Sequence, residues 1–426
     1  MAATATATPT PIPIGFTKAK GQRQSVVSRN LRCVKAEKQG LPPGILVGAV
    51  RSAWSTGWKL MMKQLAPSDR RGEYTRPDSA FRGCPEEGDV VQHSSPRYHL
   101  YAALECPWAH RALIVRALKG LHHALPLSVA SPGINGLWEF RGTNDNDNDN
   151  DVVGKLRPTA DKLHGRNTLR DVYRQRKGGY KGRATVPMLW DTLTNDVVNN
   201  ESADIIQILN SNFNTVATNP QLDLSPPSLA DPIREWNNII FPNINNGVYR
   251  HQMEISSKKN QAGSRTVFAG TIKPGQGRPL SIQRSKARCG FAQSQDAYET
   301  AVDCLFDTLD TLEAHLASSR YLCGEFLTLA DVRLFTTMFR FDPVYHILFK
   351  CSKKKLSEYP NLYGYMLDIY QMPGVASTCD LQVIMGGYYR TLFPLNPGSI
   401  QPVIPLSYEF EALNKDHNRE FISLSL

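Results

Sequence analysis

Paired cysteines are missing from this sequence. Its eight cysteines include no Cys-x-x-Cys pair and no Cys/His group at the spacing of a zinc site. The pattern therefore excludes a zinc module and gives no reason to predict a bound metal. It is typical of reduced thiols inside a cell, most of which act as small buried apolar side chains.

Long apolar runs are also missing. No stretch approaches the length that a membrane span needs, so no membrane partner is predicted. Hydrophobic residues still make up 41% of the 426 residues, which is enough for two or three domains with sizeable cores.

Net positive charge is lacking outside two segments. The formal charge of +10 would be consistent with nucleic-acid binding if it were spread over the fold. However, residues 1–40 are net +6 and residues 251–288 are net +7, which leaves the rest of the chain at −3. We therefore expect no nucleic-acid partner.

Acidic residues are almost absent from residues 1–40, where Glu37 is the only one. The segment is rich in Ala, Thr, Ser and basic residues and lacks the apolar core of a secretory signal. It is predicted to be a transit peptide, and its Thr/Ser/Pro bias favours the chloroplast. The alternative is a disordered tail on a cytoplasmic protein.

One cysteine, Cys106, has a setting that the others lack. Residues 97–104 alternate like a strand, and apolar residues recur at helical spacing after Pro107. Pro107 fits the first turn of a helix, where its missing N–H costs nothing. Cys106 is therefore predicted at a helix N-terminus, where the helix dipole and free N–H groups favour a thiolate.

The segments around Cys106 follow a recognisable order. A short strand is predicted in 125–131, a second strand follows Val186-Pro187, and an Asn-Glu-Ser cluster caps a helix at 200–202. This is the order of a thioredoxin-like domain. The alternating Asn/Asp run between them is interpreted as a solvated loop rather than a metal site.

Strand signals end near residue 228. A long amphipathic helix is predicted over 296–317. A further helix is predicted within residues 359–378, where Met372-Pro373 ends it. Thr328 and Asp331 have the spacing of a capping box, so Asp331 is interpreted as a structural cap rather than a catalytic group. The predicted parts are a transit peptide (1–40), a lead-in with a helix near 49–65 (41–95), a thioredoxin-like domain (96–215), an all-helical domain (228–395) and a C-terminal tail (396–426). The Pro-rich, irregular chain of the tail is predicted to start at residue 388, before the domain boundary.

Several strings narrow this organisation to a family. The strings are "LYAALECPWAHRALIVRALKGL", "TVPMLWD", "VVNNESADIIQILN", "NNGVYR", "CGFAQSQDAYETAV", "RFDPVYHILFKC", "YPNLYGYMLDIYQMPGVAST" and "NPGSI". Together they resemble the glutathionyl-hydroquinone reductases, the xi-class glutathione transferases, over roughly residues 70–405. The resemblance implies an α/β thioredoxin-like N-terminal domain plus an all-α C-terminal domain, which is the glutathione transferase fold, and a homodimer.

The resemblance also implies a reaction. Cys106 would attack the sulfur of an aromatic glutathionyl conjugate, and a second glutathione would resolve the mixed disulfide. Tyr249 would supply the proton that the departing aryl carbon needs. Glutathione would be a co-substrate, and no metal is involved.

The family motifs further assign the binding residues. Tyr345 and Tyr388 match tyrosines of the aromatic-acceptor site, where hydroxyls hold the quinol oxygens. A cis peptide bond before Pro187 would turn a backbone edge toward glutathione, and a helix N-terminus would hold its γ-glutamyl end. The glutathione-binding set implied in this way is Trp138, Arg183, Ala184, Thr185, Val186, Glu201 and Ser202.

The chain departs from the family pattern at two places. Residues 251–288 separate "NNGVYR" from "CGFA", which almost meet in the family, and removing them restores the family string. We interpret them as an insertion without helix or strand period, or as a gene-model artefact. The loop around Trp138 also differs by one residue from the family's Asn-Gly-Trp pattern.

Two other functions remain open from the sequence. A dehydroascorbate reductase or general thiol transferase would use Cys106 in a similar way, although it would not need the acceptor-site tyrosines. A non-enzymatic binding module would not need the Cys106 thiol at all.

Overall fold

The computed structural model describes residues 43–65, 79–85, 90, 96–133, 135–142, 154–249, 295–392, 395–404, 408–420 and 422. The predictions for residues 1–40 and 251–288 lie outside this set. The chain divides into two compact units, Met1–Thr56 and Gly57–Leu426. Helix α1 (Pro43–Leu65) begins in the first unit and covers the predicted helix near 49–65.

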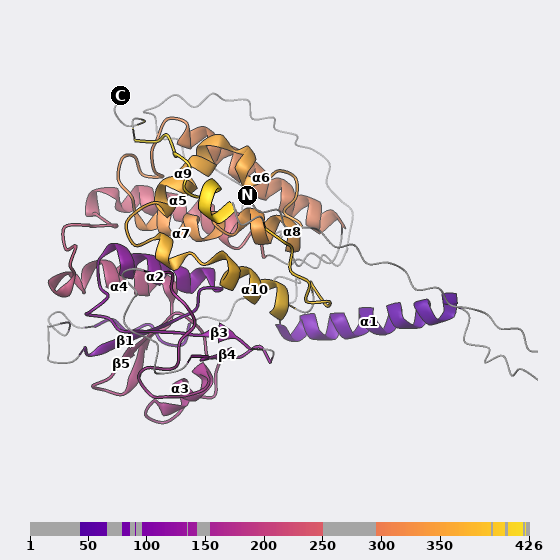
Figure 1. The fold of residues 1–426 in the computed structure, drawn as a ribbon, viewed down its shortest axis with the longest axis horizontal. Coiled ribbons are helices and arrows are strands. Elements are labelled where there is room, and N and C mark those ends of the chain that lie inside the picture. The colour runs from indigo at the N-terminus through magenta and orange to yellow at the C-terminus, as the bar shows by residue number, and fades with distance from the viewer. Residues whose placement is uncertain are drawn as a thin grey trace, which may run out of the picture. The chain divides into compact units, whose positions relative to one another are not determined.

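The second unit contains a four-stranded sheet (Figure 1). Its order is β2 (Leu127–Val129), β1 (Tyr98–Ala102), β5 (Met188–Asp191) and β6 (Asp196–Asn199). Strand β2 is parallel to β1, whereas β5 is antiparallel to both β1 and β6. Every residue of β1 is buried, because β1 lies inside the sheet and helices cover it. This is the predicted thioredoxin-like arrangement.

Helices cover both faces of the sheet. Helices α2 (Pro107–Leu118) and α4 (Ser202–Ser211) lie side by side on the face toward the C-terminal helices, and α3 (Leu169–Gln175) lies on the other side (Figure 1). A separate hairpin joins β3 (Ser131–Pro132) to β4 (Trp138–Glu139). Helix α3, strand β6 and this hairpin were not predicted from the sequence.

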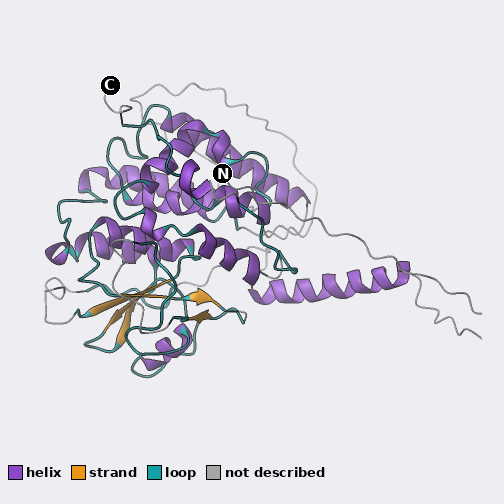
Figure 2. Cartoon of the chain, in the orientation of Figure 1, coloured by secondary structure: helices purple, strands orange, loops and turns teal. Residues whose placement is uncertain are grey.

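Among the residues described after 228, all regular structure is helical (Figure 2). The helices are α5 (Ala230–Ile240), α6 (Gln295–Leu316), α7 (Leu329–Met338), α8 (His346–Leu348), α9 (Pro360–Tyr370) and α10 (Leu381–Thr391). Two π-helical turns, η4 (Phe241–Asn245) and η5 (Phe341–Tyr345), interrupt them. The short 3-10 turns are η2 (Asn214–Val216), η3 (Pro227–Leu229), η6 (Leu356–Glu358) and η7 (Ala376–Thr378), and η8 (Tyr408–Ala412) is a further π-helical turn.

The predicted cap of α7 is confirmed. The backbone N–H of Thr328 donates to Asp331 Oδ2 at 2.8 Å, and the two residues form a capping box. The fully buried Asp331 carboxylate also accepts from the Leu322 N–H at 2.9 Å and from the Tyr365 hydroxyl at 3.0 Å. Its acceptor capacity is used within the fold, so its role is structural.

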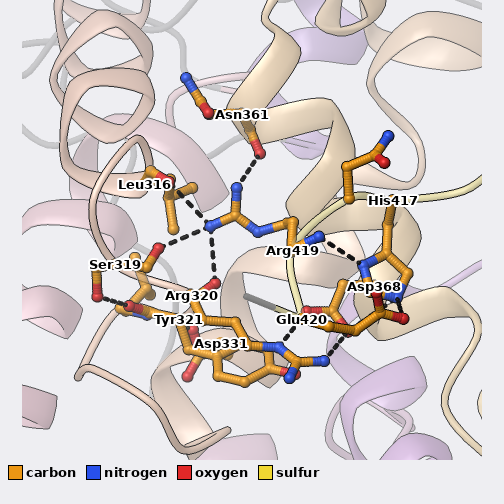
Figure 3. A network of polar contacts seen from close by, with 12 residues as sticks. Leu316, Ser319, Arg320, Tyr321, Asp331, Asn361, Asp368, His417, Arg419 and Glu420 are labelled. Carbon is orange, nitrogen blue, oxygen red and sulfur yellow. Dashed lines mark hydrogen bonds and ion pairs between the residues drawn. The ribbon is translucent and has the colours of Figure 1, made fainter. Parts of the chain in front are cut away.

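The predicted irregular tail needs a correction. Tyr388 and its three successors belong to α10, because the apolar residues that begin at Leu381 continue the same buried face. Farther along, the buried Arg419 guanidinium donates to four carbonyl oxygens of the helical domain, and Arg320 beside it forms a bidentate ion pair with Asp368 (Figure 3). These contacts fasten the described part of the C-terminal segment to the domain.

The α/β part and the helical part of the second unit share buried polar contacts, which position the site. Helix α2 packs on α7. From α2, His110 Nε2 lies 2.9 Å from the Thr378 hydroxyl, and Arg111 donates to Asn245 at 3.0 Å. The N-terminal end of α2 is therefore held directly by the helical domain.

Candidate functional site

Cys106 lies at the predicted strand-to-helix junction. It is the N-cap residue of α2 with an extended backbone (φ −83°, ψ 113°), and Pro107 occupies the first turn. The side chain is half-buried and not part of a disulfide. As the N-cap residue it lies at the N-terminus of α2, where a thiolate is favoured electrostatically.

The backbone edge predicted to bind glutathione lies against this thiol. The Cys106 thiol donates to the Val186 carbonyl oxygen at 3.7 Å, and the Val186–Pro187 peptide bond is cis, as predicted. The Thr185 carbonyl accepts from the Tyr173 hydroxyl at 2.9 Å, so a side chain of α3 holds this backbone edge in place. Ala184 is half-buried and Arg183 is exposed.

Glu201 and Ser202 lie at the start of α4, close to the same edge. Glu201 is the N-cap residue, and its carboxylate accepts from the Ala203 N–H at 3.2 Å and from Ser79 at 2.8 Å. Ser202 is buried and its hydroxyl donates weakly to Glu201, at 3.4 Å. The neighbouring Asn200 amide donates to the Thr185 hydroxyl at 3.4 Å, which links the two segments.

A cation near this helix terminus was not predicted from the sequence. Burial lowers the pKa of Arg333, on α7, to about 10, while the negative charges of Glu201 and Asp204 raise it. A guanidinium of the helical domain therefore lies within electrostatic reach of the α4 N-terminus. Nothing in the local sequence of α7 signals this placement.

Trp138 lies on strand β4 and is half-buried against the core. Its partner strand β3 packs against α10, the helix that bears Tyr388. The hairpin thus places Trp138 on the side of the α/β domain that meets the helical domain.

Three tyrosine hydroxyls meet in the helical domain. The Tyr249 hydroxyl lies 2.5 Å from that of Tyr345 and also contacts that of Tyr388, and the latter two are 3.1 Å apart. Phe349 packs edge-on against all three rings. Tyr249 follows the π-helical turn η4 and Tyr345 ends η5, which is a frequent arrangement at functional sites.

All three hydroxyls keep their protons at neutral pH. Burial raises the pKa of Tyr249 and Tyr345 well above the ordinary value, and Tyr388 raises both further, while the positive charge of Arg340 opposes the rise at Tyr345. Burial also raises the pKa of Tyr388, which the positive charge of Arg340 opposes. The cluster can therefore donate hydrogen bonds to an oxygen of an aromatic ligand and can supply a proton.

The thiol and the hydroxyl cluster belong to one site. Cys106 lies near enough to the Tyr388 hydroxyl that a negative charge on the thiol raises the pKa of Tyr388. Arg340, which directly precedes η5, donates to the Leu104 carbonyl at 2.5 Å and to His110 Nδ1 at 2.9 Å. This fully buried guanidinium ties the segment before Cys106 to the tyrosine cluster.

The other thiols that the structure describes have different surroundings. Burial raises the pKa of Cys379 to about 12 and that of Cys323 to about 11, so neither forms a thiolate near neutral pH. Cys351 is buried, and Cys304 is half-buried on α6. None of these four lies at a strand-to-helix junction, and the fifth described thiol, Cys84, is exposed.

Within the described ranges, no group of three or more His, Cys, Asp or Glu side chains is arranged to hold a metal ion. The same ranges contain no helix with both the length and the apolar character needed to cross a bilayer.

The chain matches known proteins in both domains. Residues 105–212 match the family model of the glutathione S-transferase N-terminal domain, and residues 295–367 match that of the C-terminal domain. Glutathionyl-hydroquinone reductase YqjG of Escherichia coli is 37% identical, over 82% of this chain and 93% of its own length. Glutathionyl-hydroquinone reductase PcpF of Sphingobium chlorophenolicum is 36% identical, over 85% of this chain and 96% of its own length.

Solved structures agree with these matches. The glutathione-bound structure of E. coli YqjG superposes with a TM-score of 0.61, covering 78% of this chain and 90% of that one. The xi glutathione S-transferase of Phanerochaete chrysosporium is 36% identical and superposes with a TM-score of 0.62, covering 78% of this chain and 98% of that one. The predicted fold class is confirmed. The chain belongs to the glutathionyl-hydroquinone reductases, the xi class of the glutathione transferases.

Proposed function

We propose that this protein reduces glutathionyl-hydroquinones to hydroquinones, with glutathione as co-substrate and a mixed disulfide at Cys106 as intermediate. The observation that supports this most directly is the convergence of three protonated tyrosine hydroxyls beside Cys106. A thiol transferase needs only the thiol, whereas cleavage of an aryl carbon–sulfur bond also needs a proton donor.

The first half-reaction uses both domains. The Cys106 thiolate attacks the glutathionyl sulfur, so a sulfur–sulfur bond forms while the aryl carbon–sulfur bond breaks. The electron pair of the broken bond stays on the aryl carbon, which takes a proton from Tyr249. Tyr345 and Tyr388 donate to the phenolic oxygen and to the developing tyrosinate, because both hydroxyls contact Tyr249.

The second half-reaction restores the thiolate. A glutathione thiolate attacks the mixed disulfide and leaves as oxidised glutathione, and Cys106 regains its negative charge. The proton lost by this glutathione balances the proton taken up by the aryl carbon. The two sulfur atoms that join in the disulfide provide the electrons for the reduction.

Glutathione binding is assigned to the α/β domain. The Val186 backbone beside the thiol pairs with the cysteinyl part of the tripeptide. The α4 N-terminus at Glu201 and Ser202 holds the γ-glutamyl end, where free N–H groups favour an anion. Arg183 is exposed and available to a glutathione carboxylate, and Trp138 offers a ring face.

Mass spectrometry and a paired assay test this function. Cys106→Ser should abolish turnover of glutathionyl-hydroquinones, whereas Cys304→Ser should leave it nearly unchanged. Wild-type protein treated with a glutathionyl-hydroquinone should gain one glutathione on the peptide containing Cys106. Substantial turnover by Cys106→Ser, or faster reduction of dehydroascorbate than of the quinol conjugate, would refute the proposal.

We further propose a chloroplast location and a homodimeric state. The first is supported by the acid-poor composition of residues 1–40, and the second by the family. A fusion of residues 1–45 to a fluorescent protein should enter plastids of plant cells, and light scattering should give twice the chain mass. A purely cytosolic fusion, or a monomer mass, would contradict the respective proposal.

A further inference from the structure

The residue before the reactive cysteine is a buried carboxylic acid. Glu105 is only 6% exposed, and its Oε2 atom has no hydrogen-bond partner. A buried polar atom without a partner is costly, and an isolated buried carboxylate charge costs far more. An acid in this position, next to a thiolate, needs an explanation that the proposed mechanism does not provide.

Two elements of the helical domain enclose this side chain. On α10, a Cβ atom added to Gly387 would lie 2.2 Å from Glu105 Cγ, so the stem of Glu105 lies directly on the α10 backbone, one residue before Tyr388. Arg340 approaches from the end of α7, but its hydrogen bonds go to Leu104, His110 and Thr336. Glu105 and Arg340 therefore do not form an ion pair, although they are close.

The charge balance around Glu105 favours its neutral form. Burial raises the pKa of Glu105 to about 7. The positive charges of Arg340 and Arg141 oppose this rise, and the negative charge of Asp380, the N-cap of α10, adds to it. His110, on α2, contributes no positive charge, because burial holds its pKa well below the ordinary value.

We propose that Glu105 is a positioning residue of the thiol site, which packs against α10 as an uncharged acid and suppresses the Cys106 thiolate when it ionises. The uncharged acid lets the segment before Cys106 lie on α10, with the thiol beside Tyr388. The ionised acid places a second negative charge next to the sulfur. The inference rests on the proposed function only in taking the Cys106 thiolate as the reactive form.

The size of the effect follows from the chain geometry. Consecutive Cα atoms are about 3.8 Å apart, and Glu105 lies in a bend that directly precedes Cys106. A charge on the neighbouring residue lies roughly 5 to 10 Å from the sulfur, and at an effective dielectric constant of about 20 to 40 it moves the thiol titration by about one pH unit. Because the two groups interact, their titrations are coupled.

Alkylation of the thiol measures this coupling without any substrate. The rate of iodoacetamide reaction at Cys106 is followed against pH on the full chain, by mass spectrometry of its peptide. In the wild type we expect a broad curve with two steps, since Glu105 ionises in the same range. In Glu105→Gln, which keeps the shape and removes the charge, we expect one step with its midpoint lower by about one pH unit.

Controls separate the charge from the fold. Glu235→Gln, at an exposed position of α5, should leave the curve unchanged. Glu105→Ala also removes the charge and should lower the midpoint in the same direction, so the test survives if the glutamine variant folds poorly. A single-proton curve for the wild type, or the same midpoint in Glu105→Gln as in the wild type, would overturn the proposal. If the midpoint shifts while no glutathionyl-hydroquinone is reduced, the proposed function fails and the role of Glu105 stands.

Discussion

Two adjacent glycines of α10 offer a matched test of how tightly the Cys106 segment packs on the helical domain. A Cβ atom added at Gly386 would have no heavy atom within 4 Å, whereas one added at Gly387 would lie 2.2 Å from Glu105 Cγ and 2.9 Å from Glu105 Cβ. Both positions are helical, so the change in intrinsic helix propensity is the same.

The two substitutions should therefore change the free energy of unfolding in opposite directions. Gly386→Ala should stabilise the protein by up to about 1 kcal/mol, because alanine loses less backbone freedom in a helix than glycine does. Gly387→Ala gains the same amount but must displace a buried side chain. Overpacking of this kind costs roughly 1–3 kcal/mol, and the overlap at Gly387 is severe enough to place it at the upper end. We expect the two variants to differ by roughly 3 kcal/mol in the free energy of unfolding.

Urea unfolding of both variants and the wild type, followed by circular dichroism, measures this difference. Gly387→Ala should also turn over glutathionyl-hydroquinones more slowly, because the added methyl pushes the segment before Cys106 away from Tyr388. Equal stability and activity of the two variants would show that the Cys106 segment does not rest on α10.

Three further predictions concern the chemistry and its pH dependence. Tyr249→Phe removes the proposed proton donor and should lower kcat by roughly a hundredfold. The KM for glutathione should stay unchanged, because glutathione binds in the other domain. A KM for glutathione that worsens as much as kcat does would contradict this. Glu105 has a pKa of about 7 in the fold against 4.5 for the free side chain, so its stabilising contribution is complete below pH 4.5 and is lost as pH rises through 7. Glu105→Gln should therefore gain roughly 2 kcal/mol of stability relative to the wild type between pH 5.5 and pH 8, and a pH-independent difference in urea unfolding would contradict it. Deleting residues 251–288 should raise turnover without changing glutathione affinity. The insertion follows Tyr249, where a displacement of about 1 Å can cost about a hundredfold in rate. Turnover no faster than that of the full chain would contradict this.

The features that the sequence predicted well depend on local chemistry. Pro107 in the first turn marks the start of α2, and the Asn-Glu-Ser cluster and the Thr328–Asp331 pair mark the starts of α4 and α7. Caps of this kind satisfy backbone groups within three residues of each other, so a single sequence contains the whole signal. The missed hairpin β3–β4 has two residues in each strand, too few for any periodic pattern.

The tyrosine cluster could not be predicted from local patterns. Tyr249 and Tyr345 are 96 positions apart in the chain, and each alone resembles an ordinary packed aromatic residue. The family motifs indicated these positions, and only the structure brings the three hydroxyls into mutual contact. Glu105 was also unpredictable, because its burial depends on Gly387, whose missing side chain leaves room for the carboxyl.

The proposed site is divided between two domains, so glutathione binding and proton transfer can be disturbed separately. The thiol and the glutathione-binding edge belong to the α/β domain, whereas every hydroxyl proposed for proton transfer belongs to the helical domain. Arg340 makes two of the polar contacts that join the domains near Cys106, to the Leu104 carbonyl and to His110. Changes that loosen this junction should therefore leave glutathione binding and thiol alkylation largely intact. They should slow the cleavage of the aryl carbon–sulfur bond, since that step needs the thiol and the hydroxyls in register.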